Sequence, residues 1–234
     1  MVYSDRLASA HRGRPAAGAK RNVSVDIYRA AEECLHRKNV TEITIREIAG
    51  GAGTTEAMVV YYYGSKNGLF TEIVEKSLHE ILVELKDLGD RVLLNQQMST
   101  KEYIENIIDI YYSRIPAARI LSTELVKDNS EIKNFYIEHW AKETSQVIGK
   151  IIEELVRRGV YRADVDVPQV VMMLKSLIVY PLVSDSYVRM EGFRLESFRE
   201  TQWVDALARM LDGFLASTPQ PSGEAPPMPL TSRH

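Results

Sequence analysis

Cysteine and long apolar runs are nearly absent from this sequence. Cys34 is the single cysteine among 234 residues, so the chain cannot form an internal disulfide. It has neither an N-terminal apolar run of signal-peptide type nor an 18-residue apolar run of membrane-span type. We therefore expect a soluble, cytoplasmic protein that does not enter a membrane.

The short motifs of common enzyme classes are also missing. There is no phosphate-binding glycine loop, no Gly-x-Ser-x-Gly nucleophile motif and no HExxH zinc motif. The five histidines are scattered and offer no metal-ligand spacing. Carboxylate pairs such as Glu153-Glu154 are typical of solvated helix faces. We expect no catalytic residue, no metal and no cofactor.

Charge is unevenly distributed, although the formal net charge is only −3. Residues 1–66 contain ten Lys/Arg against seven Asp/Glu, whereas residues 67–234 contain 19 against 25. Residues 1–21 contain five basic residues and a single acidic residue, Asp5. A basic arm on an acidic body is typical of DNA-binding proteins, although many unrelated proteins also have basic tails.

The two ends of the chain have compositions that do not support a packed core. Residues 1–21 are rich in Ala, Gly and Arg, and residues 217–234 contain five of the nine prolines. We expect a disordered basic arm and a disordered Pro-rich tail. Between them we expect two domains, 22–66 and 67–216.

Between these ends, apolar residues recur with a period near 3.6, and no stretch alternates as a half-buried strand does. The pattern predicts an all-α fold. In a first helix ending near Asn39, one apolar face is formed by Ile27, Ala30, Ala31, Cys34 and Leu35. Further helices are expected at 44–49, 55–63, 66–88, 100–114, 116–128, 130–158, 168–190 and 197–216.

The segment 44–63 has the pattern of a helix-turn-helix. Thr44 and Glu47 have capping-box spacing, a glycine-rich turn follows at 50–53, and Thr54 or Thr55 can cap a second short helix. This arrangement places a recognition helix in the major groove of DNA. By pattern alone, a short helical hairpin inside an ordinary bundle fits equally well.

The sequence TIREIAGGAGTTEAMVVYYYGSKNGLF, residues 44–70, resembles the DNA-binding signature of the tetracycline-repressor (TetR) family. With the first helix, the resemblance covers about 45 residues. The family-typical residue types are Thr44, Arg46, Glu47, Ile48, Ala49, Ala52, Gly53, Thr55, Ala57, Val59, Tyr62, Ser65, Lys66 and Leu69. The resemblance implies a three-helix DNA-binding domain, followed by a helical ligand-binding and dimerisation domain.

The sequence departs from the family pattern in its recognition helix. Val60 stands where a tyrosine usually meets phosphate, Glu56 where lysine is common, and Gly64 replaces a proline. Because phosphate neutralisation supplies most non-specific affinity, this helix should bind DNA weakly by itself. The arm residues Arg12 and Arg14, in an AT-hook-like Arg-Gly-Arg-Pro, are the expected compensation. A solvated basic tail is the alternative.

Within the helix-turn-helix, the expected DNA contacts follow from helix geometry. Thr44 and Lys66 are predicted near phosphates, because helix N-termini favour anions. Base reading or further backbone contact is expected from the second helix, at Thr55, Glu56, Ala57, Tyr61 and Tyr62. Tyr62 could instead pack partly into the core, and Glu56 could serve only the helix dipole.

Aromatic stripes in the remaining helices suggest a ligand pocket, since bundles bind ligands in apolar cavities with a few polar groups. An ordinary packed core is the alternative. The candidate pocket residues are Tyr103, Ile107, Tyr111, Arg114, Phe135, His139, Trp140 and Met173.

The last two long helices, at 168–190 and 197–216, contain more apolar residues than the core of one protomer can bury. By resemblance to the family they would pair with their symmetry mates in a four-helix dimer interface. Burial within a monomer is the alternative. The candidate interface residues are Met172, Leu177, Leu182, Trp203, Leu207, Met210 and Phe214.

Together these features predict a transcription regulator that binds double-stranded DNA as a homodimer. We expect a repressor that a small apolar or amphipathic effector releases from a palindromic operator. A transcriptional activator, or a helical protein-interaction adaptor with a degenerate helix-turn-helix, is the alternative.

Overall fold

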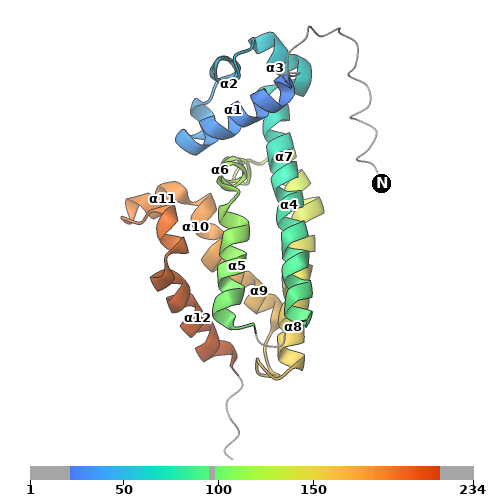
Figure 1. Cartoon of the computed structure of the whole chain (residues 1–234), viewed down its shortest axis with the longest axis vertical. Coiled ribbons are helices and arrows are strands. Elements are labelled where there is room, and N and C mark those ends of the chain that lie inside the picture. Colours follow the sequence, from blue (N-terminus) through green and yellow to red (C-terminus); the bar gives the residue numbers. More distant parts are fainter. Residues whose placement is uncertain (1–21, 95–97, 217–234) are drawn as a thin grey trace, which may run out of the picture. The chain divides into compact units, whose positions relative to one another are not determined.

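The computed structural model describes residues 22–94 and 98–216, which form helices and no strand (Figure 1). The all-α prediction is confirmed. The arm and the tail, on which the disorder predictions fall, lie outside the described residues. The chain divides into two compact units between Leu69 and Phe70. No helix in the described ranges has the length and apolar character needed to cross a membrane.

The N-terminal unit packs two short helices against a longer one. Its elements are α1 (Val23–Arg37), the 3-10 turn η1 (Val40–Glu42), α2 (Ile45–Gly51), α3 (Glu56–Tyr63) and the start of α4 (Lys66–Leu94). The predicted apolar face of α1 is confirmed, since all five of its residues are buried. Ile48 of α2 and Val59 of α3 are each 0% exposed and complete this core.

The predicted stop of α1 near Asn39 is confirmed, but two details of the helix ends in this unit were wrong. Helix α1 ends at Arg37, and Asn39 is extended rather than left-handed: it caps η1 in a capping box with Glu42. The glycines do not break α2 at Ala49, because the helix continues to Gly51 and the left-handed residue is Gly53, with φ 58°.

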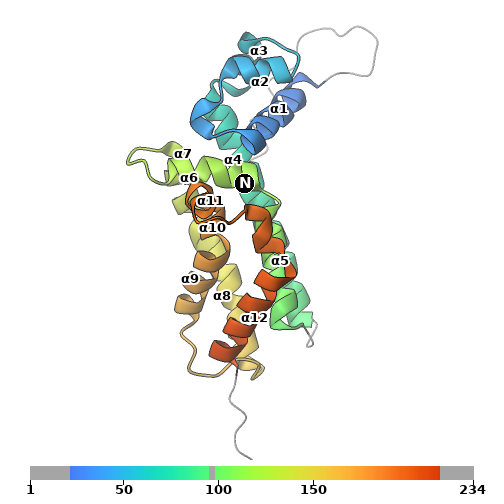
Figure 2. The same cartoon turned by 90° about the vertical axis from the view of Figure 1, so that its left-hand side faces the viewer.

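The body unit contains the rest of α4 and the later helices (Figure 2). Helix α12 lies along α5, α8 packs against α9, and α6 packs against α10. These elements are α5 (Thr100–Tyr112), α6 (Ile115–Glu124), α7 (Glu131–Phe135), the π-helix η2 (Tyr136–Ala141), α8 (Lys142–Arg157), α9 (Val167–Ile178), α10 (Tyr180–Val183), α11 (Asp185–Met190), the 3-10 helix η3 (Leu195–Arg199) and α12 (Thr201–Leu215).

The two longest predicted helices of the body are interrupted. The expected helix 130–158 contains the π-helical segment Tyr136–Ala141 between α7 and α8. The expected helix 168–190 is broken between α9 and α10, close to Pro181. Proline lacks the amide that a continuous helix needs, and its ring crowds the preceding turn.

Candidate DNA interface and ligand cavity

Helix α3 exposes one face while the opposite side anchors it in the core. Val59 is 0% exposed, whereas Tyr61 is 69% and Tyr62 is 39% exposed. The rings of Tyr61 and Tyr62 meet edge to face, with centroids 5.1 Å apart. Thr55 holds the N-cap position, and its side chain makes no capping hydrogen bond. The Thr55 hydroxyl is therefore exposed, and so are the side chains of Tyr61 and Tyr62, so that all three can contact a partner.

Hydrogen bonds at the C-terminal end of α3 hold this face in place. The Tyr63 hydroxyl donates to the Ser24 carbonyl oxygen at 2.7 Å and so ties α3 to the start of α1. Gly64 ends α3 with φ 72°, a conformation that glycine adopts without strain. The Ser65 hydroxyl then accepts from the Gly68 amide at 2.9 Å and starts α4.

Thr44 and Lys66, both expected near phosphates, contact their own unit. The Thr44 hydroxyl accepts from the Glu47 amide at 3.2 Å. The Glu47 carboxylate pairs with the Lys38 ammonium at 2.8 Å. The Lys66 ammonium donates to the Ile43 carbonyl oxygen at 2.8 Å and thereby braces the loop before α2.

The charge of the N-terminal unit depends on the arm. Residues 22–66 contain five Lys/Arg and six Asp/Glu. Arg12 and Arg14 lie outside the described residues. Arg46, which the sequence suggested only as a signature residue, is exposed in the first turn of α2.

Residues of the body unit form a partly open cavity of about 250 Å³, and its wall is mostly apolar. Five helices and the π-helical segment contribute to it. The lining residues are Leu78, Ile81, Tyr111, Arg114, Ala117, Ala118, Leu121, Leu125, Tyr136, Lys175, Ser176, Val179, Tyr180, Leu182 and Val183. Among the residues predicted for a pocket, Tyr111 and Arg114 are part of this wall.

The other predicted pocket residues lie elsewhere in the body. Tyr103 and Ile107 are buried core residues of α5. Phe135 stacks with His139 and Trp140 at centroid distances of 5.0 and 6.5 Å, outside the cavity wall. Met173, on α9, is half-buried and is not part of the wall either. These six residues are therefore not part of the wall of this cavity.

The two cationic residues of the cavity wall have different partners. The Arg114 guanidinium pairs with the carboxylates of Glu84 and Glu80. The Lys175 ammonium donates to the Ala141 carbonyl oxygen at 3.1 Å and to the hydroxyls of two further residues. Desolvation lowers the pKa of Lys175 to about 8. The sequence did not indicate Lys175 as a site residue, since a lysine in an apolar helix produces no periodic pattern.

Residues 27–73 match the family model described as bacterial regulatory proteins, tetR family. The HTH-type transcriptional repressor NicS of Pseudomonas putida is 26% identical over 160 residues, covering 66% of this chain and 73% of that protein. The HTH-type regulator EthR of Mycolicibacterium smegmatis is 28% identical over 129 residues, covering 52% and 57%. Over residues 27–73 this chain carries a DNA-binding domain of the TetR family, and the similarity to HTH-type transcriptional regulators continues beyond that domain.

Solved structures of bacterial regulators share the fold of this chain over most of its length. Bacillus subtilis FadR, solved in complex with stearoyl-CoA, superposes with a TM-score of 0.59 at 16% identity and covers 80% of this chain and 97% of that structure. Mycobacterium tuberculosis KstR2, a ketosteroid transcriptional regulator, superposes with a TM-score of 0.59 at 14% identity and covers 88% and 100%. These likenesses show that the body unit shares the helical architecture of known regulators.

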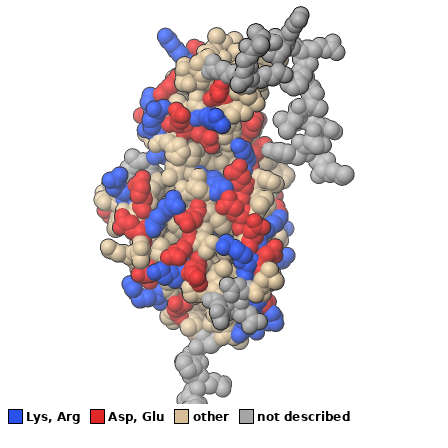
Figure 3. All heavy atoms as spheres, viewed as in Figure 1, with Lys and Arg blue, Asp and Glu red and all other residues tan. Residues whose placement is uncertain are grey.

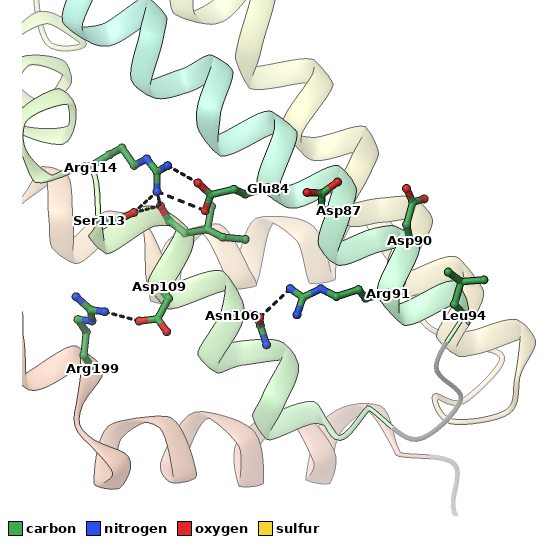
Figure 4. Close-up of a pocket in the computed structure, with 11 residues that line it drawn as sticks. Glu84, Asp87, Asp90, Arg91, Leu94, Asn106, Asp109, Ser113, Arg114 and Arg199 are labelled. Atoms are coloured by element: carbon green, nitrogen blue, oxygen red, sulfur yellow. Dashed lines mark hydrogen bonds and ion pairs between the residues drawn. The ribbon is translucent and has the colours of Figure 1, made fainter.

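A second hollow of the body unit is open and polar (Figure 4). Acidic residues of α4, among them Asp87 and Asp90, line this hollow together with residues of α5 such as Asn106. Arg91 donates to Asn106 at 2.8 Å, and Arg199 pairs with Asp109 at 2.5 Å. Side chains of both signs are interspersed over the face shown in Figure 3. This hollow therefore resembles ordinary solvated helix surface more than a ligand site.

Among the described residues, no group of three or more His, Cys, Asp or Glu side chains could hold a metal ion. The family match points to a regulator rather than an enzyme.

Only part of the predicted dimer set is exposed. Met172 is 66%, Met210 44% and Phe214 38% exposed. Leu182 and Leu207, by contrast, are 2% and 5% exposed within the protomer. The side chains of these two residues are already covered by their own chain. The remaining members, Leu177 and Trp203, are half-buried; Trp203 meets Phe198 edge to face at 4.7 Å.

Proposed function

We propose that this chain is a TetR family regulator, a homodimeric repressor that binds a palindromic operator through α3 and leaves it when a small apolar or amphipathic molecule fills the body cavity. The observation that carries the proposal is the exposed face of α3 over its buried Val59 anchor. We assign DNA binding to residues 22–66, and ligand binding and dimerisation to residues 67–216. The repressor role is supported by the similarity to NicS.

Helix α3 offers groups suited to the major groove. In its exposed first turn, the Glu56 carboxylate can accept from the cytosine N4 amine and the Ala57 methyl can contact a thymine methyl. Thr55, Tyr61 and Tyr62 supply hydroxyls for phosphate or base edges. These exposed groups of α3 favour recognition of the base sequence over strong binding to any DNA.

The basic arm is proposed to supply the missing affinity. Since residues 22–66 carry no excess of positive charge, Arg12 and Arg14 would add counterion release and contacts in the minor groove. Deleting residues 1–21 should therefore flatten the salt dependence of operator binding. An unchanged salt dependence would contradict this role of the arm.

Dimerisation is proposed to use the exposed apolar side chains of α9 and α12. Met172, Met210 and Phe214 together offer apolar surface that water would otherwise cover. A two-fold dimer also matches a palindromic operator. Light scattering at working concentration should give the mass of two chains, and a monomer would contradict this.

Effector control is supported by the cavity and by helix α4. Leu78 and Ile81 of α4 form part of the cavity wall, and the same helix begins at Lys66 in the N-terminal unit. A ligand acts on DNA binding only if its affinity differs between the DNA-bound and free states. FadR shows, for its own case, that a protein of this fold can bind an amphipathic molecule, stearoyl-CoA.

The test is a gel shift with DNA from the promoter region of the protein's own gene. We expect a retarded complex that contains two chains per operator. No complex with that DNA, from a folded dimer, would favour the adaptor alternative. A reporter gene behind the same promoter then distinguishes repression from activation by the sign of its response.

A further inference from the structure

We propose that the effector is a small apolar molecule carrying one carboxylate, and that Lys175 is the residue that binds this carboxylate. The inference rests on the proposed function, since it names the chemistry of the ligand in the same cavity. It follows from the charges on the cavity wall and from the contacts of two cationic side chains.

The wall of the cavity is apolar except for a few groups, and it contains no Asp or Glu. Lys175 and Arg114 are its two cationic residues. The charge of Arg114 is already balanced, because its guanidinium pairs with Glu84 and with Glu80, at 3.5 Å in the latter case. Lys175 is therefore the cationic residue of the wall whose charge is not balanced by a carboxylate of the described residues and can attract an anionic ligand.

All observed partners of the Lys175 ammonium are neutral. They are the Ala141 carbonyl oxygen at 3.1 Å, the Thr144 hydroxyl at 3.2 Å and the Ser145 hydroxyl at 2.6 Å. Across residues 22–94 and 98–216, no carboxylate forms an ion pair with Lys175. A half-buried charge without a counterion is unfavourable, and an incoming carboxylate would relieve this cost.

Desolvation alone lowers the pKa of Lys175 to about 8. At neutral pH the side chain is thus still mostly an ammonium. A bound carboxylate would stabilise this charged form through an opposite charge and through a charge-assisted hydrogen bond.

A purely structural role explains the hydrogen bonds of Lys175 but not its charge. Ala141 ends the π-helical segment, and Lys175 satisfies its carbonyl oxygen. A neutral donor such as glutamine could serve that oxygen without the cost of desolvating an ammonium. Substitution by glutamine therefore separates the two roles.

The size of the cavity limits the ligand. At about 250 Å³ it is smaller than the range of roughly 300–1,000 Å³ typical of sites for drug-sized molecules. Its apolar wall suits a short aliphatic or aromatic frame. Octanoate and its neutral counterpart octanamide are a matched pair of probes, since they differ only in the head group.

The experiment is calorimetric titration of both probes into the full chain and three variants. We expect the natural protein to bind octanoate at least about tenfold more tightly than octanamide, as charge-assisted hydrogen bonds allow. Lys175→Gln should lose this preference and keep its affinity for octanamide. Lys175→Arg should keep the preference. Lys150→Gln, at an exposed position of α8, is the matched control and should behave as the natural protein does.

Two outcomes would overturn the inference directly. One is equal affinity of the natural protein for the two probes, or no binding of either. The other is a preference for octanoate that survives in a folded Lys175→Gln variant, with folding checked by circular dichroism. Failure of the regulator function would appear differently, as the absence of a DNA complex without any probe, so the two failures are distinguishable.

Discussion

The N-terminal unit and the body unit use their side chains in opposite ways. In the N-terminal unit, the proposed functional groups of α3 face outward, with Tyr61 69% exposed. In the body, the groups proposed to bind the effector line a cavity, where Lys175 and Tyr111 are part of the wall. The outward site is built from one contiguous segment, and the cavity from helices far apart in the sequence.

This contrast implies different responses to substitution. A side chain that contacts only a partner can be substituted without loss of the fold, because it contributes little to the stability of the folded chain. A group in a packed wall contributes to both stability and binding, since interiors are close-packed. The following predictions test this contrast.

Leu182→Ala should have the largest effect. Leu182 is 2% exposed and is part of the cavity wall, so its truncation should lower the free energy of unfolding by about 3 kcal/mol. Urea denaturation measures this, with Val126→Ala, at an 81% exposed position, as a control that should change it by less than about 0.5 kcal/mol. Loss of the dimer without loss of stability would instead return Leu182 to the interface.

Gly68→Ala should destabilise the N-terminal unit by about 2 kcal/mol. A Cβ atom at Gly68 would lie 2.1 Å from the Tyr63 carbonyl oxygen, so the junction of α3 and α4 must shift. The matched control is Gly50→Ala in α2, where a Cβ meets nothing within 4 Å. That control should stabilise the unit by about 0.5 kcal/mol. Equal melting temperatures for the two variants would refute the packing argument.

Tyr61→Ala should reduce operator affinity about tenfold, or by about 1.4 kcal/mol, with an unchanged melting temperature. The ring is mostly exposed, so the fold loses little when it is removed. Fluorescence anisotropy with labelled operator measures the affinity, and Tyr61→Phe shows how much of the effect belongs to the hydroxyl. Normal binding by a folded Tyr61→Ala variant would remove this residue from the interface.

The pH dependence of stability should reveal the buried charge of Lys175. Desolvation lowers its folded-state pKa to about 8 from 10.5, so the unfolded chain binds more protons between these values. Stability of the natural protein should therefore rise relative to Lys175→Gln by about 1 kcal/mol from pH 8 to pH 9. Urea denaturation at both pH values gives this difference. Parallel profiles for the two proteins would contradict a buried ammonium.

The buried helix faces and the main cap of the N-terminal unit could be predicted from the sequence. The buried face of α1 and the cap at Thr44 follow from periodicity and spacing that operate within one or two helical turns. The partner of Lys66 could not be predicted, because its contact with Ile43 joins α4 to the loop before α2. Local patterns contain no information about such tertiary hydrogen bonds.

The body could be predicted as helical, but its cavity could not. Aromatic stripes indicated a pocket around Phe135 and Trp140, whereas the structure packs these rings together beside the cavity. The π-helical turn and the break near Pro181 rotate the following helices, so the face of each helix cannot be read from a regular period.

The most direct test of the account is the sequence preference of DNA binding by the full chain. Anisotropy should be measured at one salt concentration with a duplex from the protein's own promoter region and with a scrambled duplex of equal composition. We predict an affinity for the first duplex at least about a thousandfold higher. Equal affinity for both duplexes would show that the exposed face of α3 does not read base sequence.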